Sequence, residues 1–301
     1  MSRTGKRWPL LASAARPGTS TTTGNSSTTA WKMPSAMPRS MALVHERPTV
    51  NADKQCTPMI DPLLHTAARI LTFEQQRPLS NASGFFFERD ERLFLVTSRH
   101  VLVDEPTGHF PDRLEIELHI DPDNLGRSTG FSIPLYQNGK SVWRQGEDSA
   151  GGIDVAVIEI QRSALPETTV YRAFTPDHLH DPDDLVEIGT PLLIVGFPLG
   201  FHDALHHMPV VRHAVVASSF GLRFQGQGYF LTDARTHRGT SGSAVVMRVS
   251  ESNQNLGDLP WMPLGVHSAR IDLGGRDVLL DEALGLNCAW YADIITTLTS
   301  S

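Results

Sequence analysis

His100, Asp154 and Ser241 are residue types that serine-based acyl transfer requires, and each stands at the edge of an apolar run. A serine hydroxyl is a poor nucleophile near neutral pH and needs an adjacent base to remove its proton. An imidazole titrates in the right range, and a buried carboxylate can fix its tautomer and stabilise its protonated form. The order histidine, aspartate, serine makes the joint occurrence more specific than any of the three alone. The sequence therefore predicts a catalytic triad of these residues.

The candidate nucleophile stands in a glycine-rich turn. Gly239 would leave the backbone N–H groups of Gly239 and Ser241 exposed to the oxygen that becomes negatively charged during acyl transfer, so we expect these groups to form the oxyanion hole. An α/β-hydrolase site is disfavoured. In that family the nucleophilic serine stands in a Gly-x-Ser-x-Gly turn, and the aspartate and histidine of the triad follow the serine in the chain. Here position 243 is Ser243, and His267 is the only later histidine.

The elements that must position these residues are short strands. Long helical patterns between the apolar runs are absent, which disfavours βαβ units and a parallel sheet. About a dozen short strands in roughly 230 residues predict an all-β fold of antiparallel barrels or sandwiches. Asp61 before Pro62 predicts a capped helical turn over 61–68. The segment 292–298 is expected to form a closing helix. The expected strands are centred on 84–87, 93–97, 114–120, 131–133, 155–160, 192–195, 210–216, 229–232, 244–247 and 264–267.

Residues 1–60 have a different composition from the rest and are predicted to be a low-complexity, disordered tail. Serine and threonine runs without apolar periodicity cannot bury enough surface to offset the entropy of ordering. Two targeting functions compete with plain disorder. A basic stretch at 3–7 before an apolar stretch at 8–15 weakly resembles a signal peptide. The Arg- and Ser/Thr-rich start also resembles an organelle transit peptide. Translation from a later methionine is a third alternative.

Charge and composition exclude several classes of function. The net charge of the 301 residues is −7, and the first 50 residues hold seven Lys or Arg against one acid, so the remainder is strongly acidic. Such a chain is a poor binder of nucleic acid, and no apolar stretch approaches the roughly 20 residues that span a bilayer. Cys56 and Cys288 are far apart, which favours a reduced, cytoplasmic protein. No nucleotide fingerprint is present, and no cofactor is predicted.

One histidine-rich segment is a candidate metal site. His202 and His206 are spaced i,i+4, with His207 beside them, and on a helix such a pair could bind zinc. The glutamate of a His-Glu-x-x-His motif is missing, and the segment follows Pro198 and Gly200. The sequence favours a solvated loop, and no metal is predicted.

The sequence from about 62 to 298 resembles the chymotrypsin-fold serine peptidases of the bacterial trypsin-like kind, which include the high-temperature-requirement proteases and the glutamyl endopeptidases. The segment 97–102 matches their catalytic histidine motif, and 154–157 matches their aspartate motif. The segment 195–200 matches the Gly-x-Pro-x-Gly turn that opens the second barrel. The segment 232–234 matches the Thr-Asp-Ala motif that precedes the nucleophilic serine.

The resemblance implies a fold and an activity. The fold would be two six-stranded antiparallel β-barrels with a short C-terminal helix. Residues 61–175 would form the first barrel, with His100 and Asp154, and 176–301 the second, with Ser241 and the specificity pocket. The activity would be that of a serine endopeptidase, which cleaves protein or peptide substrates through an acyl-enzyme without a cofactor.

The resemblance also suggests residues that determine specificity. In glutamyl endopeptidases a Gly-Ile-His strand and a threonine five residues before the nucleophile line a pocket for an acidic side chain at P1, the residue before the cleaved bond. Gly265 to His267 and Thr236 match these positions, and Ser268 matches a serine that bonds the catalytic aspartate. The alternative is that His267 simply ends a barrel strand.

Two departures from the family pattern are visible. Ala244 stands where proline is usual, and only about three residues follow the expected final helix, so no PDZ domain is expected. A second class of function also stays open. The same barrels could form a catalytically silent binding or sensor module, or a protease kept latent until a partner protein or a cleavage orders its oxyanion loop.

Overall fold

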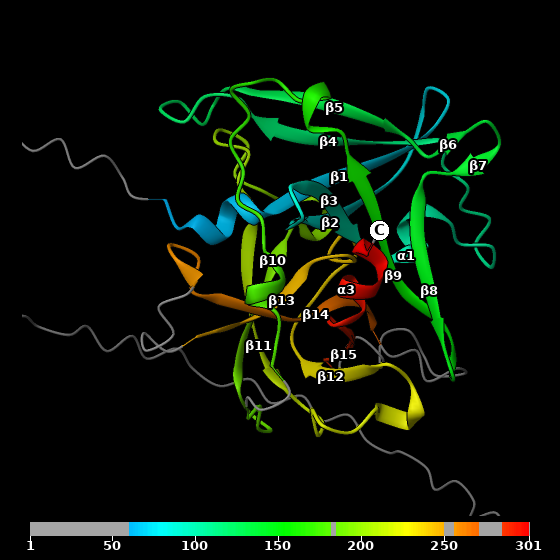
Figure 1. The fold of residues 1–301 in the computed structure, drawn as a ribbon, viewed down its shortest axis with the longest axis vertical. Coiled ribbons are helices and arrows are strands. Elements are labelled where there is room, and N and C mark those ends of the chain that lie inside the picture. The colour runs from blue at the N-terminus through cyan, green and yellow to red at the C-terminus, as the bar shows by residue number, and fades with distance from the viewer. Residues whose placement is uncertain (1–59, 182–184, 250–255, 271–284, 301) are drawn as a thin grey trace, which may run out of the picture. The chain divides into compact units, whose positions relative to one another are not determined.

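The computed structural model describes residues 60–181, 185–249, 256–270 and 285–300, and the expected tail therefore lies outside the described residues except for Ile60. Strands account for most of the ordered structure (Figure 1). No helix among the described residues is long and apolar enough to cross a membrane. The all-β prediction is confirmed.

The N-terminal half forms one antiparallel sheet of seven strands, in the order β5-β4-β1-β2-β3-β9-β8. Its end strands β5 and β8 are connected in the chain through a short hairpin of β6 (Tyr136–Gln137) and β7 (Lys140–Ser141). A six-stranded barrel was expected for this half; the described residues form a sheet of seven strands instead, and no pairing between its end strands β5 and β8 closes it. The strands are β1 (Ala67–Glu74), β2 (Arg77–Arg89), β3 (Arg92–Thr97), β4 (Arg113–His119), β5 (Ser128–Pro134), β8 (Trp143–Asp148) and β9 (Gly151–Ile160).

The C-terminal half forms a closed barrel of six antiparallel strands, in the order β10-β11-β12-β15-β14-β13. The barrel closes where β10 pairs with β13. The connection 161–190 between sheet and barrel contains the expected boundary at 175/176. The barrel strands are β10 (Pro191–Gly196), β11 (Val210–Val216), β12 (Tyr229–Asp233), β13 (Ala244–Arg248), β14 (Trp261–Arg270) and β15 (Leu286–Tyr291).

The helices are short and lie between strands or at the end of the chain. The first, η1 (Pro62–Thr66), begins as predicted, with the Asp61 carboxylate accepting from the N–H of Leu63 at 3.0 Å. It is a 3₁₀ helix, and the chain becomes strand β1 at Ala67, where the helical turn was expected to continue. The other helices among the described residues are α1 (Arg99–Leu102), η2 (Arg162–Ala164), η3 (Pro176–His178), η4 (Pro198–Gly200), η5 (Phe224–Gly226) and α3 (Ile294–Thr299).

Strand β9 carries the aspartate and is buried on both faces. Its alternate residues enter two different apolar clusters, because successive side chains of a strand point to opposite sides. Val155 and Val157 join the cluster that the sheet shares with the barrel, whereas Ala156 and Ile158 join the sheet's own interior. Strand β9 is therefore held firmly from both sides.

The shared cluster sets the position of the barrel against the sheet. Its members are almost fully removed from water, so each contributes on the order of 1.5–3 kcal/mol of hydrophobic stabilisation. Two separate clusters fill the sheet and the barrel. Members of the shared cluster from both halves include Phe85, Phe87, Val157, Val195, Val246 and Trp290.

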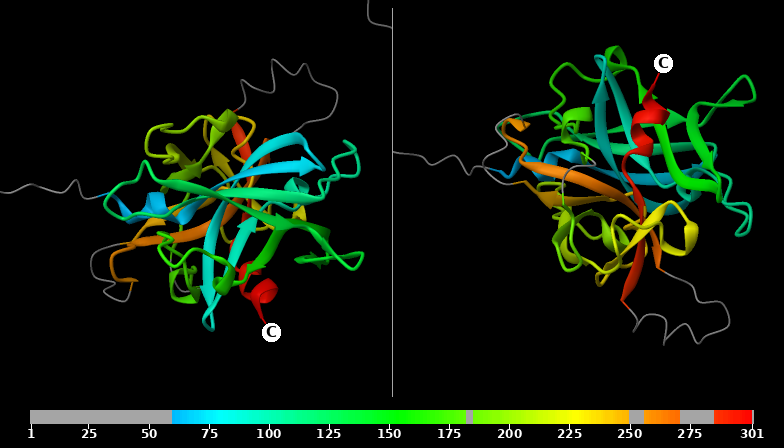
Figure 2. Two further views of the ribbon diagram at one scale, coloured as in Figure 1. Left: turned by 90° about the horizontal axis from the view of Figure 1, so that it is seen from above. Right: turned by 60° about the horizontal axis from the view of Figure 1, so that its bottom comes forward.

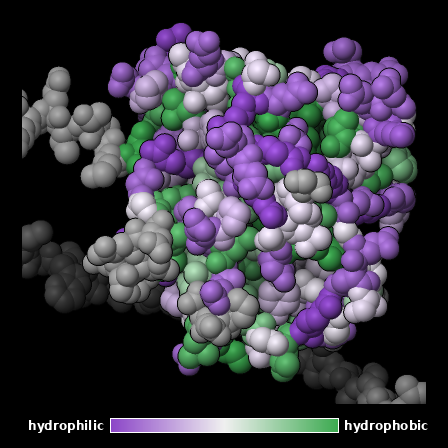
Figure 3. Space-filling view, viewed as in Figure 1, coloured by the Kyte–Doolittle hydropathy of each residue, from purple (hydrophilic) through white to green (hydrophobic). Residues whose placement is uncertain are grey.

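Helix α3 lies against β8 and β9 of the first sheet (Figure 2). Ile295 and Leu298 bury their side chains in the shared cluster. The guanidinium of Arg144 donates to the carbonyl of Ser300 at 2.5 Å, and that of Arg89 to the carbonyl of Thr296 at 2.6 Å. These arginines donate to carbonyls of the helix C-terminal turn, a position that favours basic side chains. On the face shown in Figure 3, hydrophilic and hydrophobic side chains are interspersed.

Candidate active site

The structure brings His100 and Asp154 into direct contact. His100 lies on α1, one short turn after β3, and Asp154 lies on β9, which pairs with β3. Nδ1 of His100 is 2.7 Å from Oδ2 of Asp154, and the backbone N–H of His100 donates to Oδ1 at 2.8 Å. A carboxylate only accepts, so Nδ1 carries the proton and Nε2 has a free lone pair. Nε2 can therefore act as a base.

The protonation equilibrium of His100 is shifted by its surroundings. Burial by itself lowers the pKa of His100, but the hydrogen bond and the negative charge of Asp154, together with the charge of Asp104, outweigh burial and raise it above its ordinary value of 6.5. The side chains of His100 and Asp154 are 33% and 22% exposed, so the imidazole remains accessible.

Ser241 lies in the turn between β12 and β13 of the barrel. Its Oγ donates to the backbone carbonyl of Ser268 at 2.9 Å. Among the hydrogen bonds of the described residues, none joins this hydroxyl to His100. The hydroxyl of Ser268 donates to Oδ2 of Asp154. One residue of β14 therefore contacts both the serine and the aspartate, and the candidate triad is connected through it.

The backbone of the serine turn is held by its carbonyl groups. The carbonyl of Arg238 accepts from the N–H of Leu199 at 2.5 Å, and that of Thr240 from the N–H of Ser243 at 3.0 Å. In a trans peptide the next N–H points away from the carbonyl. The N–H groups of Gly239 and Ser241 thus point away from these contacts, and within the described part of the chain neither has an acceptor.

Gly239 and Gly242 have backbone conformations that side chains resist. Their φ angles are +91° and +85°. A Cβ on Gly239 would lie 2.7 Å from the carbonyl oxygen of Phe197, and one on Gly242 would collide with the carbonyl of Ser83 and with Thr97. Glycine is therefore required at both positions.

Ser83 connects this turn to the first sheet, and sequence reasoning missed it. It lies on β2 and is fully buried. Its N–H donates to the carbonyl of Ser241 at 2.9 Å, and its hydroxyl donates to the carbonyl of Gly239 at 2.7 Å. The same hydroxyl accepts from the N–H of Phe197 at 2.9 Å. Ser83 therefore fixes the backbone on both sides of the nucleophile.

A second connection joins the histidine segment to the serine turn. The carbonyl of His267 accepts from the N–H of Gly242 at 2.7 Å and from the hydroxyl of Ser98 at 3.1 Å. Ser98 immediately precedes α1 and lies two residues before His100. No sequence signal identifies Ser83 or Ser98, because each bonds backbone groups more than a hundred positions away.

The residues that the resemblance assigned to specificity are all buried. Thr236 is 6% exposed, and its hydroxyl donates to Oδ1 of Asn287 at 2.5 Å. His267 is 2% exposed, and its Nδ1 has no hydrogen-bond partner among the described residues. Burial, and to a lesser degree the nearby His100, lowers the pKa of His267 to about 4. His267 is therefore neutral at pH 7.

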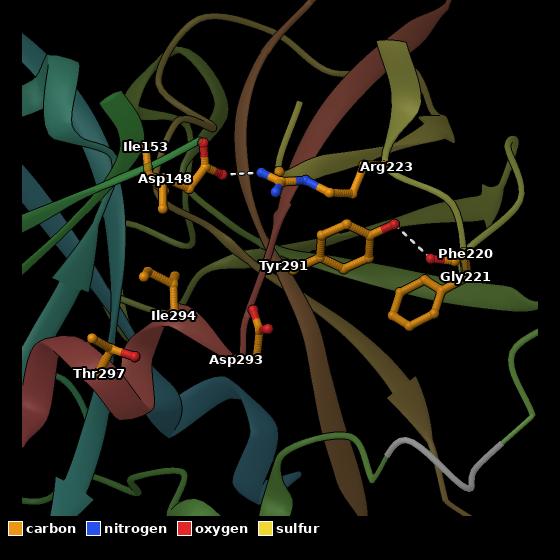
Figure 4. Close-up of a pocket in the computed structure, with 10 residues that line it drawn as sticks. Asp148, Ile153, Phe220, Gly221, Arg223, Tyr291, Asp293, Ile294 and Thr297 are labelled. Atoms are coloured by element: carbon orange, nitrogen blue, oxygen red, sulfur yellow. Dashed lines mark hydrogen bonds and ion pairs between the residues drawn. The ribbon is translucent and has the colours of Figure 1, made fainter. Parts of the chain in front are cut away.

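Two cavities lie near the candidate triad. One, of about 310 Å³, is lined by Asp154 together with Arg99, Gln145 and Glu147. A larger one, of about 410 Å³, contains neither His100 nor Ser241 (Figure 4). In the larger cavity Arg223 pairs with Asp148, and the hydroxyl of Tyr291 donates to the carbonyl of Phe220. These polar groups already have partners, so we place the chemistry at the His100–Asp154 pair rather than in the larger cavity.

A comparison with protein families shows which family the chain belongs to. The model of the trypsin-like peptidase domain matches residues 82–251, which is more than half of the chain. The chain belongs to this family. This trypsin-like peptidase domain has the chymotrypsin-like fold that the resemblance implied.

The chain was also compared with solved structures and with curated proteins. The crystal structure of the serine endoprotease from Yersinia pestis matches with a TM-score of 0.45 and 14% sequence identity. The match covers 78% of this chain and 62% of that one, so the chain spans about three fifths of that protein's length. No curated protein matches the sequence.

Proposed function

We propose that the protein is an endopeptidase that uses Ser241 as nucleophile, His100 as general base and Asp154 to orient the imidazole. The observation that carries this proposal is the position of Ser268, which accepts from the Ser241 hydroxyl and donates to the aspartate bound to His100. The family supplies the reaction class, hydrolysis of peptide bonds.

The proposed reaction proceeds in two halves. The Ser241 hydroxyl leaves the Ser268 carbonyl and turns to Nε2 of His100, which takes its proton as Oγ bonds to the carbonyl carbon of the substrate. The N–H groups of Gly239 and Ser241 donate to the oxyanion. His100 then protonates the leaving amine as the C–N bond breaks. Water attacks the acyl-enzyme, His100 takes its proton, and the proton returns to Ser241 as the acid leaves.

We further propose a preference for an acidic P1 side chain, received by His267. The imidazole is neutral, so a substrate carboxylate would be bound through an N–H donor rather than by a resident positive charge. The unpartnered, buried Nδ1 of His267 supports this assignment, because a buried polar nitrogen without a partner costs free energy that a bound carboxylate can recover. The Thr236 hydroxyl already donates to Asn287 and would serve to shape the pocket.

The test is a peptide library varied at P1, assayed on the wild-type protein and on Ser241→Ala. We expect the wild type to cleave glutamyl peptides faster than the matched glutaminyl peptides and to react with a fluorophosphonate probe. Ser241→Ala should lose both cleavage and labelling while its circular dichroism spectrum stays the same. Equal cleavage by the two proteins would refute the triad, and equal rates on the two peptides would refute the P1 assignment alone.

A latent protease is the second candidate, and one observation favours it. The Ser241 hydroxyl is bonded to Ser268 and not to His100 in the described contacts. If this arrangement persists in solution, the wild type will be inert to the fluorophosphonate until a partner protein or a cleavage reorients the side chain. Labelling of the purified protein by itself distinguishes the two functions.

A further inference from the structure

Outside the active site, the structure brings Glu117, His202 and His207 together. Glu117 lies on β4 of the first sheet, and the two histidines lie on the loop that follows β10 of the barrel. One potential ligand atom from each residue lies within 4.8 Å of the other two. The sequence favoured a solvated loop here, with no metal, over a zinc site of His202 and His206 on a helix. The loop is not helical, and it is His207 that joins His202.

His202 is oriented as a metal ligand usually is. Its Nδ1 is 2.7 Å from the backbone carbonyl of Gly200, which can only accept. The proton therefore lies on Nδ1, and Nε2 keeps its lone pair. A ligating histidine commonly donates its other ring N–H to a carbonyl, which fixes both the tautomer and the direction of the free nitrogen.

The contact between His207 and Glu117 is not an ordinary ion pair. Nδ1 of His207 lies 2.8 Å from Oε1 of Glu117, yet this buried nitrogen has no hydrogen-bond partner in the described structure. The oxygen is therefore close but out of line with the ring nitrogen. Two atoms that bind the same ion lie close together in this way, because the lone pair of each is directed at the ion and not at the other atom. The backbone of His207 has a φ of +56°, which a histidine adopts at a cost.

The neighbours of the cluster hold its ligands in place. The hydroxyl of Ser128 donates to Oε1 of Glu117 at 2.9 Å, and Arg69 lies 3.6 Å from Oε2. The imidazole of His119, on β4, donates to the carbonyl of His206 at 2.7 Å and so attaches the loop to the sheet. These contacts orient the carboxylate and the loop before any ion binds.

We propose that Glu117, His202 and His207 form a binding site for a divalent transition-metal ion, zinc above all. Two imidazoles and one carboxylate are donors that suit zinc, and three protein ligands leave a fourth, tetrahedral position for water. None of the three residues contacts His100, Asp154 or Ser241 in the described structure. Because the ligands come from the sheet and from a barrel loop, the ion links the two halves of the fold.

The test is calorimetric titration of zinc chloride into the full chain after treatment with a chelator. We expect one tight zinc ion per chain. Glu117→Gln, His202→Ala and His207→Ala should each weaken zinc binding by at least about tenfold. His206→Ala is the matched control, since this half-exposed imidazole of the same loop pairs with Asp203. It should bind zinc within about threefold of the wild type, because its backbone carbonyl remains to accept from His119.

A second measurement guards against variants that fail to fold. The melting temperature of each protein is recorded with the chelator and with zinc, and cobalt is added to the wild type as a spectroscopic probe. Zinc should raise the melting temperature of the wild type and of His206→Ala but not of the three ligand variants, and cobalt should show the visible bands of tetrahedral coordination. No zinc binding by the wild type, equal binding by all variants, or loss of binding in His206→Ala overturns the assignment.

Discussion

The two sides of the candidate active site are prepared to different degrees. On the sheet side, His100 and Asp154 already make the bond that the mechanism requires, and the carboxylate also accepts from the backbone of His100. On the barrel side, the turn around Ser241 is held by carbonyl contacts, but the hydroxyl itself is bonded to Ser268. The difference follows from the strength of the interactions. A charge-assisted hydrogen bond holds the imidazole, whereas only one neutral bond holds a hydroxyl that can rotate about χ1.

The largest effect is expected on the prepared side. Asp154→Asn should lower kcat by about 10⁴-fold, because an amide no longer enforces the Nδ1–H tautomer of His100. The measurement is steady-state cleavage of the best peptide from the library, with circular dichroism as the control for folding. A loss of less than about tenfold would mean that the pair is structural and does not serve catalysis.

On the barrel side, Gly239→Ala should lower kcat by about 10²- to 10³-fold, the usual cost of losing one oxyanion donor. The added Cβ collides with the carbonyl of Phe197 and displaces the Gly239 N–H. Gly139→Ala is the matched control, because Gly139 also has a positive φ, of +75°, but no atom lies within 4 Å of the added Cβ. If both variants lose activity equally, backbone strain and not the oxyanion turn is responsible.

The connection between the two sides should be visible in stability. Ser83→Ala removes the hydroxyl that holds Gly239 and leaves the N–H of Phe197 buried without its acceptor. We expect the free energy of unfolding in urea to fall by about 1–3 kcal/mol, together with a decrease in kcat. The exposed Ser132 gives the control variant Ser132→Ala, which should change neither. An unchanged kcat in Ser83→Ala would show that the turn keeps its shape without this hydroxyl.

The smallest effect is expected in the pH profile. Because His100 must be neutral to act as a base and its pKa is raised, kcat/KM should rise with pH to a plateau through a midpoint above 6.5. Asp104→Asn removes a weaker raising charge and should move this midpoint slightly to lower pH. The same raised pKa stabilises the folded protein below pH 6.5, and that contribution is lost as the pH rises through the folded value. A midpoint at or below 6.5 would contradict the assignment of His100 as the base.

The fold was predictable where the apolar pattern is regular. The run 114–120 alternates apolar and polar residues, and β4 was expected there; the apolar run at 155–160 became part of β9. Five of the described strands were not expected, namely β1, β6, β7, β8 and β15, and in two of them the inward residues are not uniformly apolar. Strand β1 buries Thr72 between apolar neighbours, and β15 buries Asn287, whose amide donates to three backbone carbonyls. In the sequence, a buried polar residue of this kind cannot be distinguished from a surface residue.

The sequence by itself determined the chemistry available to this protein, because side-chain type and the order histidine, aspartate, serine are local properties. It also indicated the all-β class, since strand periodicity is local as well. Only the tertiary structure decided which groups meet. Ser83 reached the serine turn, Ser268 came between Asp154 and Ser241, and Glu117 joined two loop histidines. These contacts depend on how the sheet and the barrel pack through their shared core, and that packing depends on many residues together.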